Sequence, residues 1–370
     1  MSLALDLAAE VGFEARPNPR VGAILVRDGQ IIAQGATQAY GGEHAEARLL
    51  AQLTSPDQAR GATLYVSLEP CGDFPGKQTP ACVDALVPLG LARAVIATLD
   101  PHPGTSGLSA ERLRAAGVSV EVGCCAERAH RLNGPFFKRQ LRAAAGLTPL
   151  PYLSAKWAMS LDGKIACHTG HSQWISGPES RQQVHVLRGQ VDAVVVGSGT
   201  ALADDPRLNR RQVPGGDPLP VVLDRRCRLP LESQLVAAAS ERGLLVVLGP
   251  EAPAPRVAAL VAAGAEVLRV DERDSLTPLL EHLGSRGFDH VLLEGGGEVL
   301  AAAFAADLVD RALVFVAPRI LGGRGAPGPV GGLGVAEVGL GPQPISLSAA
   351  SCGDDLLLEA HFHVYGLDSP

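Results

Sequence analysis

Positive charge, lysine and long apolar segments are all scarce in this sequence of 370 residues. Lysine and arginine together number 32 against 39 aspartates and glutamates, so the formal net charge is −7. This acidic balance argues against a protein that captures nucleic acid or an anionic membrane by charge. No apolar run approaches the roughly 20 residues that cross a bilayer. The N-terminal segment carries Asp6 and Glu10 before any basic residue, so we expect no signal peptide and neither a membrane nor a nucleic-acid partner.

The cysteine content does not predict a disulfide framework. Seven cysteines, an odd number, are spread along the chain, which is typical of a reducing compartment where thiols pack or bind metal. Apolar residues make up 46% and charged residues 19% of the sequence, which is a globular composition. At about 150 residues per domain, the chain has the length of two or three domains. We expect a cytoplasmic protein that acts on a small molecule, and we also expect a homo-oligomer.

Short apolar strands alternate with helical patterns in two successive parts of the chain. The Ala-, Gly- and Pro-rich stretch 143–151 separates the two parts. The alternation predicts an α/β fold with a layered sheet in each part, and residues 321–343, crowded with Gly and Pro, predict a long loop. The pattern over 356–365 would place His361 and His363 on a solvated strand face. The predicted domains are 1–146 and 147–370, and the predicted strands include 21–26, 63–68, 94–99, 118–122, 152–159, 192–196, 220–223, 244–248, 267–270, 290–293 and 313–316.

The strongest chemical signal is His44-Ala45-Glu46, followed by Pro70-Cys71 and then by Cys82. A neutral imidazole and two thiolates are good zinc ligands, and three protein ligands leave a fourth position for water, as in catalytic zinc sites. The metal lowers the pKa of that water to about 7, and Glu46 lies close enough in sequence to the histidine to move its proton. These residues, in this order, are typical of zinc deaminases, which release ammonia from a nucleobase ring.

The spacing of the two cysteines departs from that pattern. Ten residues, 72–81, separate Cys71 from Cys82, whereas the deaminase pattern has about two. A loop of this length still allows both thiols to reach one metal. A structural alternative is that His44 caps a helix and both cysteines are core thiols. The four residues in order, with a strand leading into Cys71 and a helix following Cys82, favour zinc.

The second part of the chain has no Gly-x-Gly-x-x-Gly turn between a strand and a helix, so a Rossmann fold has no support. Two other glycine-rich turns suit phosphate groups, because residues 197–200 and 295–297 each follow an apolar strand. Glycine lets backbone N–H groups approach a phosphate, and a helix N-terminus favours negative charge. Such turns are common between strands and helices, so each turn alone is a weak signal.

Further motifs occur in order along nearly the whole chain, and together with His44-Ala45-Glu46 they resemble the bifunctional deaminase/reductase family of riboflavin biosynthesis. The resemblance implies a cytidine-deaminase-like three-layer domain followed by a dihydrofolate-reductase-like domain. The motifs are Pro17-Asn18-Pro19-Arg20-Val21-Gly22, Leu68-Glu69-Pro70-Cys71, Thr79-Pro80-Ala81-Cys82, Asp100-Pro101-His102-Pro103, Lys156 to Gly163, Ser172 to Ser176, Asp192 to Val194, Gly197 to Thr200, Leu202 to Pro206 and Glu294-Gly295-Gly296.

The resemblance implies two consecutive reactions. The first is a zinc-dependent deamination of 2,5-diamino-6-ribosylamino-4(3H)-pyrimidinone 5′-phosphate, and the second is reduction of the ribosyl group to ribityl by NADPH. Between the two cysteines, the sequence is longer than the family pattern and lacks its usual histidine. By position, the implied zinc ligands are His44, Cys71 and Cys82, the implied proton carrier is Glu46, and the implied substrate contacts are Asn18, Lys77 and Asp100.

The resemblance also implies residues for the reductase. Arg188 and Arg211 would clamp the ribose phosphate, since a guanidinium matches phosphate geometry, and the charge of Arg225 would favour the 2′-phosphate of NADPH. Lys156 and Asp204 are alternative candidates for placing or protonating the opening sugar. The implied NADPH contacts are Ala158, Trp174, Thr200, Asp204, Arg225, Gly296, Gly297, Glu298, Val299, Leu300, Ala301 and Ala302, and the implied substrate contacts are Ser172, Arg188, Leu208, Arg211 and Glu294.

Three other functions fit parts of this pattern. They are a reductase with a silent deaminase domain, a nucleobase deaminase fused to a degenerate partner, and a ligand sensor that has lost turnover. The acidic net charge and the second set of motifs argue against the nucleobase deaminase. Glu46 argues against the sensor, because a structural zinc does not need a proton carrier.

Overall fold

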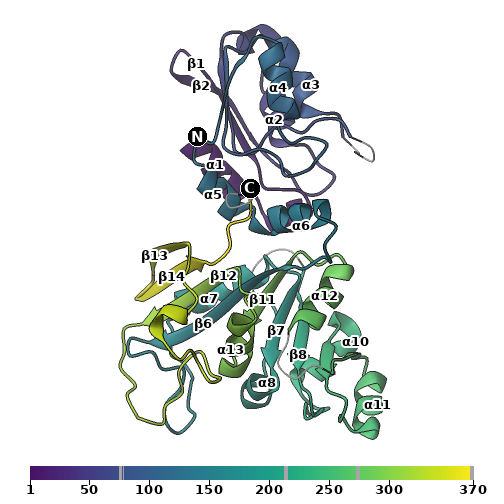
Figure 1. Ribbon diagram of the computed structural model, residues 1–370, viewed down its shortest axis with the longest axis vertical. Helices are drawn as coiled ribbons and strands as arrows, with labels where there is room; N and C mark the ends of the chain where they lie inside the picture. Colours follow the sequence, from purple (N-terminus) through teal and green to yellow (C-terminus); the bar gives the residue numbers. More distant parts are fainter. Residues whose placement is uncertain (75–76, 78, 212–215, 272–275, 367–370) are drawn as a thin grey trace. The chain divides into compact units, whose positions relative to one another are not determined.

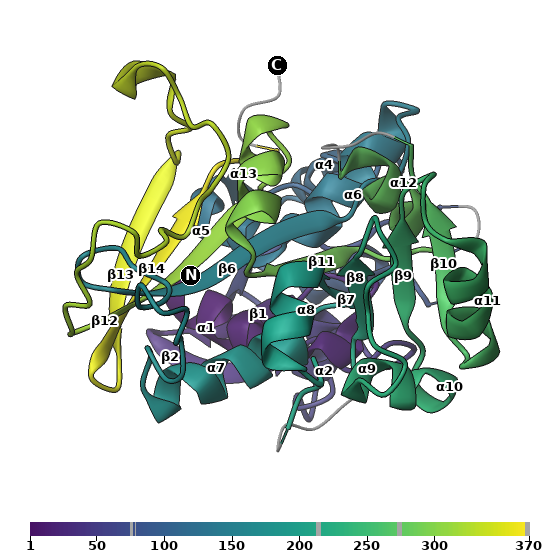
Figure 2. The same cartoon turned by 90° about the horizontal axis from the view of Figure 1, so that it is seen from below.

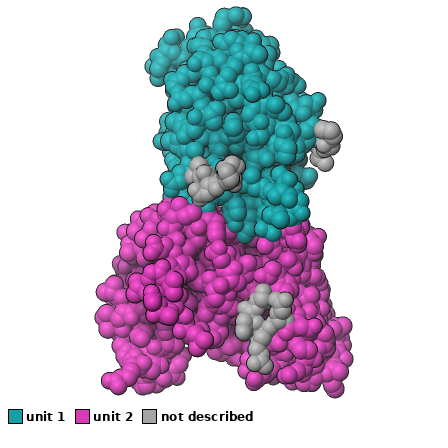
Figure 3. Space-filling view, viewed as in Figure 1, with its two compact units in different colours: residues 1–147, 364–370 teal, residues 148–363 magenta. Residues whose placement is uncertain are grey.

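The computed structural model describes residues 1–74, 77, 79–211, 216–271 and 276–366. The chain forms two compact units (Figure 3). Unit 1 contains Met1–Leu147 and the C-terminal residues from Val364, and unit 2 contains Thr148–His363. The chain therefore passes between the units twice, once at the stretch rich in Ala, Gly and Pro and once near its end. No helix in the described ranges is long and apolar enough to span a membrane.

Unit 1 is built on a five-stranded mixed sheet with the strand order β2-β1-β3-β4-β5 (Figure 1). β1 pairs antiparallel with both β2 and β3, whereas β3, β4 and β5 run parallel. The strands are β1 (Gly22–Arg27), β2 (Gln30–Ala36), β3 (Thr63–Val66), β4 (Arg93–Ile96) and β5 (Ser119–Val122), and the helices are α1 (Ser2–Glu10), α2 (Ala45–Leu50), α3 (Cys82–Leu86), α4 (Leu108–Ala115), α5 (Ala126–Leu132) and α6 (Gly134–Ala144).

Two glycines show that helices cover both faces of this sheet. A Cβ atom on Gly22 would lie 2.0 Å from the carbonyl oxygen of Ala4 in α1, and one on Gly35 would lie 2.2 Å from that of Ala45 in α2. Gly35 is opposite Ala23 in the β1–β2 ladder, so it faces away from Gly22. α1 and α2 therefore pack on opposite faces, and unit 1 has three layers, as predicted.

Unit 2 is built on a nine-stranded sheet with the order β10-β9-β8-β7-β11-β6-β12-β14-β13. The strands from β10 to β12 run parallel, and β14 and β13 add an antiparallel edge, which Figure 2 shows at the opposite end of the row from β10. The strands are β6 (Tyr152–Ser160), β7 (Ala193–Gly197), β8 (Leu219–Leu223), β9 (Leu245–Leu248), β10 (Glu266–Arg269), β11 (His290–Glu294), β12 (Arg311–Ala317), β13 (Ser346–Cys352) and β14 (Asp355–His361), and the helices are α7 (Pro178–Arg188), α8 (Ser198–Asp204), α9 (Gln234–Ala237), α10 (Ala239–Arg242), α11 (Ala254–Ala262), α12 (Thr277–Ser285) and α13 (Gly297–Ala305).

The central strands of unit 2 are buried along their whole length. Every residue of β7, β9 and β11 is buried, and two apolar clusters pack against the sheet. Such continuous apolar runs are expected when helices cover both faces of a parallel sheet. The predicted α/β fold in two parts is therefore confirmed.

Two local predictions near the C-terminus differ from the structure. β13 was not predicted, because its sequence of small and polar residues lacks the apolar alternation of a strand with one buried face. The predicted solvated face of the last strand is wrong for His361, which is only 4% exposed. Its Nε2 lies 2.8 Å from Oε1 of Glu359, and its Nδ1 lies 3.4 Å from the hydroxyl of Tyr152. These polar partners allow an imidazole to be buried where alternation alone predicts solvent.

Candidate functional site

The three predicted zinc ligands lie at the ends of three different elements of unit 1. His44 is the N-cap of α2, and Cys82 is the first residue of α3. Cys71 lies in the chain that follows β3. The close approach of Gly35 to Ala45 presses the start of α2 against the sheet, which fixes the position of His44 beside the cysteines.

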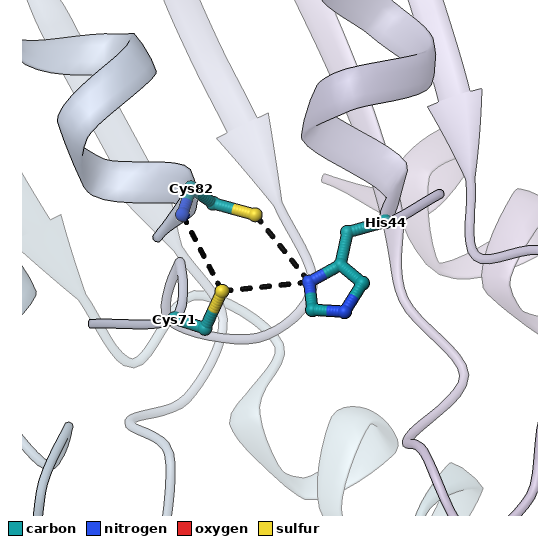
Figure 4. A group of neighbouring side chains, drawn as sticks. All are labelled: His44, Cys71 and Cys82. Atoms are coloured by element: carbon teal, nitrogen blue, oxygen red, sulfur yellow. Dashed lines mark hydrogen bonds between the residues drawn. The ribbon is translucent and has the colours of Figure 1, made fainter. Parts of the chain in front are cut away.

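The ligand atoms of these residues converge on one point (Figure 4). The Sγ atoms of Cys71 and Cys82 each lie 3.4 Å from Nδ1 of His44, and all three atoms lie within 4.8 Å of one another. One imidazole nitrogen and two sulfurs are donors that zinc prefers, and three protein ligands leave a coordination position open. The residues present therefore fit the expected ion, and the long spacing between the cysteines does not separate their thiols.

Glu46 lies on the same helix as the histidine cap and lines the cavity beside the three ligands. It is only 4% exposed, and burial raises the pKa of its carboxyl group to about 7. A carboxyl group held near the metal ligands, with little solvent around it, is suited to carry a proton between water and a substrate.

Lys77 contacts one of the predicted metal ligands, Cys71. Its Nζ lies 2.8 Å from Sγ of Cys71, 2.9 Å from the carbonyl oxygen of Gly72 and 3.3 Å from that of Pro80. Hydrogen bonds from Cys82, together with contacts from His44 and Lys77, hold the pKa of the Cys71 thiol well below its usual value. The ammonium group thus stabilises a thiolate and also joins the carbonyl oxygens of Gly72 and Pro80.

A cavity of about 270 Å³ opens beside these residues. Two of the predicted substrate contacts, Asn18 and Asp100, line it together with Lys77. Burial raises the pKa of Asp100 to about 7. We did not predict from the sequence that α6 forms one wall of this cavity, because the basic end of this helix carries no pattern that shows which part of unit 1 it faces. The missed lining residues of α6 are Phe136, Arg139 and Gln140.

Glu69 is a second residue whose role the sequence did not reveal. Its buried carboxylate accepts hydrogen bonds from the backbone N–H groups of Asp100 at 3.2 Å, Gly107 at 2.8 Å and Ala110 at 3.0 Å. These bonds tie the segment after β3, which carries Cys71, to the loop that carries Asp100 and to the start of α4. The carboxylate therefore positions one wall of the unit 1 cavity.

Replacement of Glu69 by glutamine tests this role. The amide nitrogen would face N–H donors, and a buried donor without an acceptor costs about 1–3 kcal/mol. We expect Glu69→Gln to shift the urea midpoint of zinc release to lower urea. Glu121→Gln is the matched control, because it removes an exposed ion pair with Arg93 that contributes less than about 1 kcal/mol. Equal shifts for both variants would contradict this role for Glu69.

A second cavity, of about 730 Å³, lies in unit 2 at the C-terminal ends of β7 and β11. The Gly295–Gly296 turn has φ values of 70° and 79°, which favour glycine, and α13 begins directly after it. The helix N-terminus and its exposed backbone N–H groups suit the phosphates of NADPH. The predicted residues that line this cavity are Ala158, Ser172, Arg188, Thr200, Asp204, Leu208, Glu294, Gly296, Gly297, Glu298, Val299 and Leu300.

A charged cluster forms the floor of the unit 2 cavity. Arg188 binds Glu294 through two hydrogen bonds, of 2.6 and 2.8 Å. Lys156 is opposite Glu294 in the parallel β6–β11 ladder. Burial lowers the pKa of the Lys156 ammonium group. Burial alone would raise the pKa of the Glu294 carboxyl group, but the positive charge of Arg188 outweighs this effect and lowers it. The arginine predicted as a phosphate clamp is thus held in a nearly buried ion pair.

Five predicted residues lie outside the unit 2 cavity. Trp174 is 63% exposed, and the guanidinium of Arg181 stacks 4.7 Å from its ring centre. Arg211 is exposed, and its Nε donates to Oδ1 of Asn209 at 3.4 Å. Ala301 is half-buried in α13. Arg225 and Ala302 line a neighbouring cavity of about 300 Å³, here called the arginine cavity, which shares Ser198, Leu223, Arg228, Glu298 and Val299 with the larger one.

Two known families match the two parts of the chain. The zinc-binding region of cytidine and deoxycytidylate deaminases matches residues 1–98, and the RibD C-terminal domain matches residues 151–358. The riboflavin biosynthesis protein RibD of Aquifex aeolicus is 36% identical over 97% of this chain and 96% of its own length, and RibD of Escherichia coli is 34% identical over 87% and 88%.

Solved structures give the same result. Acinetobacter baumannii RibD superposes with a TM-score of 0.76 at 32% identity over 97% of both chains. A Thermotoga maritima deaminase/reductase superposes with a TM-score of 0.76 at 31% identity over 98% of this chain and 97% of its own. The chain therefore belongs to the RibD family of bifunctional riboflavin-biosynthesis enzymes, with a zinc-binding deaminase domain and an NADPH-dependent reductase domain.

Proposed function

We propose that residues 1–146 deaminate 2,5-diamino-6-ribosylamino-4(3H)-pyrimidinone 5′-phosphate and that residues 147–370 reduce the ribosyl group of the product to ribityl. The main support is the convergence of His44, Cys71 and Cys82 beside the buried Glu46. The Thermotoga maritima relative is described as a diaminohydroxyphosphoribosylaminopyrimidine deaminase and 5-amino-6-(5-phosphoribosylamino)uracil reductase, which supports the same substrate here.

In the deaminase, the chain supplies the ligands and the proton carrier. His44, Cys71 and Cys82 would hold the zinc ion, which would act as a Lewis acid and lower the pKa of a water to about 7. Glu46 takes a proton from the attacking water and delivers it to the ring nitrogen next to the amidine carbon. It then carries the remaining hydroxyl proton to the amine, the C–N bond breaks, and ammonia leaves. Asn18 and Asp100 hold the ring in the cavity.

In the reductase, the chain binds and protonates the sugar. NADPH supplies the hydride that C1′ receives. As the bond between C1′ and the ring oxygen breaks, the ammonium of Lys156 delivers a proton to that oxygen. The ion pair between Arg188 and Glu294 holds the negative charge beside Lys156 in place. Asp204 is the alternative donor, since it lines the same cavity and burial raises the pKa of its carboxyl group.

The arginine cavity fits the 2′-phosphate of NADPH. Arg225, Arg226 and Arg228 line it, and an arginine is the usual partner of that phosphate. Nη1 of Arg225 donates to the carbonyl oxygen of Val270 at 3.3 Å, and Nη2 of Arg228 donates to Oγ of Ser198 at 2.7 Å. Arg226 is exposed at the rim of the cavity. We propose that Arg226 and Arg228 act with the predicted Arg225 in selecting NADPH.

This proposal predicts a change in cofactor preference. We expect Arg226→Ala to lower kcat/KM for NADPH about 10-fold or more, because a charge-assisted hydrogen bond contributes about 1.5–3 kcal/mol. The kcat/KM for NADH should stay within about twofold, since NADH lacks the phosphate. Arg286→Ala, which breaks an exposed ion pair with Glu266 in the same unit, is the control. A parallel loss with both cofactors would show that Arg226 does not select the phosphate.

We propose a homo-oligomer that forms through the edge of the unit 2 sheet. β13 is the edge strand, and its Leu347 is exposed. The preceding loop exposes further large apolar side chains, among them Leu333, Val338 and Ile345. An unpaired edge strand next to a loop with exposed apolar side chains is a template for pairing with another chain, and a second copy in antiparallel register would cover both.

Leu347→Lys is expected to convert the oligomer into a monomer, because it places a charge on the pairing edge. Size-exclusion chromatography with light scattering measures the mass of wild type and variant at equal concentration. Val261→Lys on α11 is the control, since this valine is exposed on a helix away from the edge strand. A wild-type mass of one chain would contradict the proposal.

The chain is also proposed to act in the cytoplasm, without a nucleic-acid or membrane partner. None of the seven cysteines, all of which lie in the described ranges, forms a disulfide, which fits a reducing compartment. The acidic net charge gives no electrostatic basis for binding phosphate backbones.

Ammonia release from the diaminopyrimidine phosphate, measured with and without NADPH, tests the proposed function. Wild type should release ammonia in both cases and consume NADPH only after deamination. If NADPH were consumed only when the deaminated compound is supplied, the chain would be a reductase with a silent deaminase domain. Bound zinc with neither ammonia release nor NADPH consumption would favour a ligand sensor, and RNA binding with a steep salt dependence would favour a nucleobase deaminase.

A further inference from the structure

Four residues, Ser160-Leu161-Asp162-Gly163, form a tight turn between two stretches of chain that line the unit 2 cavity. Residues 156–158 of β6 line the cavity before the turn, and residues 165–166 line it after the turn. The N–H group of Gly163 donates to the carbonyl oxygen of Ser160 at 2.9 Å, and the φ of Gly163 is 75°, which favours glycine. The family resemblance includes this motif but implies no role for it.

The carboxylate of Asp162 accepts hydrogen bonds from a distant segment of the chain. Its Oδ1 accepts from the backbone N–H of Leu321 at 3.1 Å, and its Oδ2 accepts from that of Gly322 at 2.8 Å. Oδ1 also accepts from the hydroxyl of Ser160 at 2.6 Å. The Ser160 hydroxyl and the two backbone N–H groups lower the pKa of Asp162 to about 2, so both oxygens are charged acceptors at neutral pH.

Backbone hydrogen bonds join the same two segments on either side of Asp162. The N–H group of Leu161 donates to the carbonyl oxygen of Arg319 at 2.8 Å, and that of Ile165 donates to the carbonyl oxygen of Pro327 at 3.0 Å. The turn after β6 therefore holds residues 319–327 through several bonds, and Asp162 supplies the side-chain acceptors among them.

The distant segment then reaches the N-terminus of α13. The N–H group of Gly331 donates to the carbonyl oxygen of Gly297 at 2.9 Å, and that of Gly332 donates to Oε1 of Glu298 at 3.3 Å. A Cβ atom on Gly331 would lie 2.4 Å from the same Oε1, so the segment lies close against the helix. Glu298, which we predicted as a cofactor contact, is thus an anchor for this segment.

Residues 319–332, here called the wall segment, are therefore anchored at both ends. Between the anchors, Pro327 and Pro329 line the unit 2 cavity. Six of the 14 residues in the wall segment are glycine, and glycine loses the most conformational freedom when it is ordered. A wall that is ordered before the cofactor binds removes this cost from the binding step.

We propose that Asp162 is a positioning residue for the cofactor, because it holds the wall segment against the N-terminus of α13 before NADPH binds. This inference rests on the proposed function, which places NADPH in the unit 2 cavity, and adds to it the group that orders the wall of that cavity. Asp162 is not among the described residues that line the cavity, so it acts through the wall segment and not through contact with NADPH.

The first test is cofactor binding to the full chain, followed by fluorescence. We expect Asp162→Ala to raise the Kd of NADPH about 10-fold, because the cofactor must then order the wall segment itself. The Kd of NADH should rise by the same factor, since no described residue of the wall segment lines the arginine cavity. Asp162→Asn should have an intermediate effect, because the amide keeps one acceptor oxygen. Asp354→Ala, in the exposed turn between β13 and β14, is the control.

Hydrogen exchange without cofactor tests the wall segment separately from binding. Peptides that cover residues 319–332 should exchange faster in Asp162→Ala than in wild type, because the N–H groups of Leu321 and Gly322 lose their acceptor. Peptides from the buried strand β9 should exchange at the wild-type rate. Ammonia release should also equal that of wild type, because Asp162 belongs to unit 2.

Three results would overturn the role of Asp162 in a wild-type chain that binds NADPH. They are an unchanged exchange rate over residues 319–332, faster exchange with an unchanged Kd for NADPH, and a rise in Kd that is confined to NADPH. The last would place the effect on the 2′-phosphate. If wild type bound neither cofactor, the proposed function of unit 2 would fail instead, so the two failures are distinguishable.

Discussion

Glu46→Gln is expected to lower the deaminase kcat by about 10³-fold or more, because a positioned acid–base group contributes about 10²–10⁴-fold and Glu46 lines the cavity beside the three ligand residues. The amide has the same shape but does not carry a proton between water and the ring nitrogen. Ammonia release under saturating substrate measures the loss.

The same preparation supplies the internal control for Glu46. Its zinc content should be that of wild type, and its NADPH oxidation with the already deaminated compound should be unchanged. Glu43→Gln is the matched variant, since this exposed glutamate directly precedes the histidine cap. A kcat within tenfold of wild type in Glu46→Gln would remove Glu46 from the proposed role.

Lys156→Met is expected to lower the reductase kcat by about 10²–10³-fold through loss of the proton donor. The fold should persist, because Glu294 keeps its two hydrogen bonds to Arg188. The ammonia release of the variant should equal that of wild type. NADPH oxidation with the deaminated compound, together with NADPH binding by fluorescence, measures the effect on catalysis apart from the effect on binding.

The pH dependence gives a second test of Lys156. Burial lowers the pKa of its ammonium group, and the donor must be protonated, so the wild-type rate should fall as the pH rises through this lowered pKa. The variant should lose that limb of the profile. Lys164→Met is the control, because Lys164 is not among the residues that line the unit 2 cavity. Its Nζ donates instead to the carbonyl oxygen of Ala326 at 3.1 Å. If Asp204→Asn lost the activity and Lys156→Met kept it, the donor would be Asp204.

The metal ligands and the sheets are the parts that sequence predicts best. His44, Cys71 and Cys82 are visible because their chemistry restricts the residue types, and the strands of unit 2 are visible because burial on both faces requires unbroken apolar runs. Both signals are local in the sequence. The predicted loop 321–343 follows from its glycine and proline content alone.

Contacts between distant residues are the parts that the sequence did not predict. The ion pair of Arg188 with Glu294 joins residues 106 positions apart. No sequence pattern distinguishes an arginine in such an ion pair from one that binds a phosphate. Lys77 was predicted as a substrate contact from its position in the family resemblance, and it lines the predicted cavity. The contact of its Nζ with Sγ of Cys71, at 2.8 Å, is a further feature that the sequence did not reveal.

The return of the chain to unit 1 after His363 bears on whether the two activities can be separated by cutting. Val364 is buried, the ring centre of Tyr365 lies 5.5 Å from Nζ of Lys138, and Gly366 lies against His130 and Phe137. A fragment that ends at residue 147 would lack the residues that pack on His130 of α5 and on Phe137 and Lys138 of α6. These packing contacts are made by residues that are synthesised after the whole second domain, so we expect the packing of unit 1 to be completed last during translation. A gene split at the boundary would need to restore this short C-terminal segment to its first half.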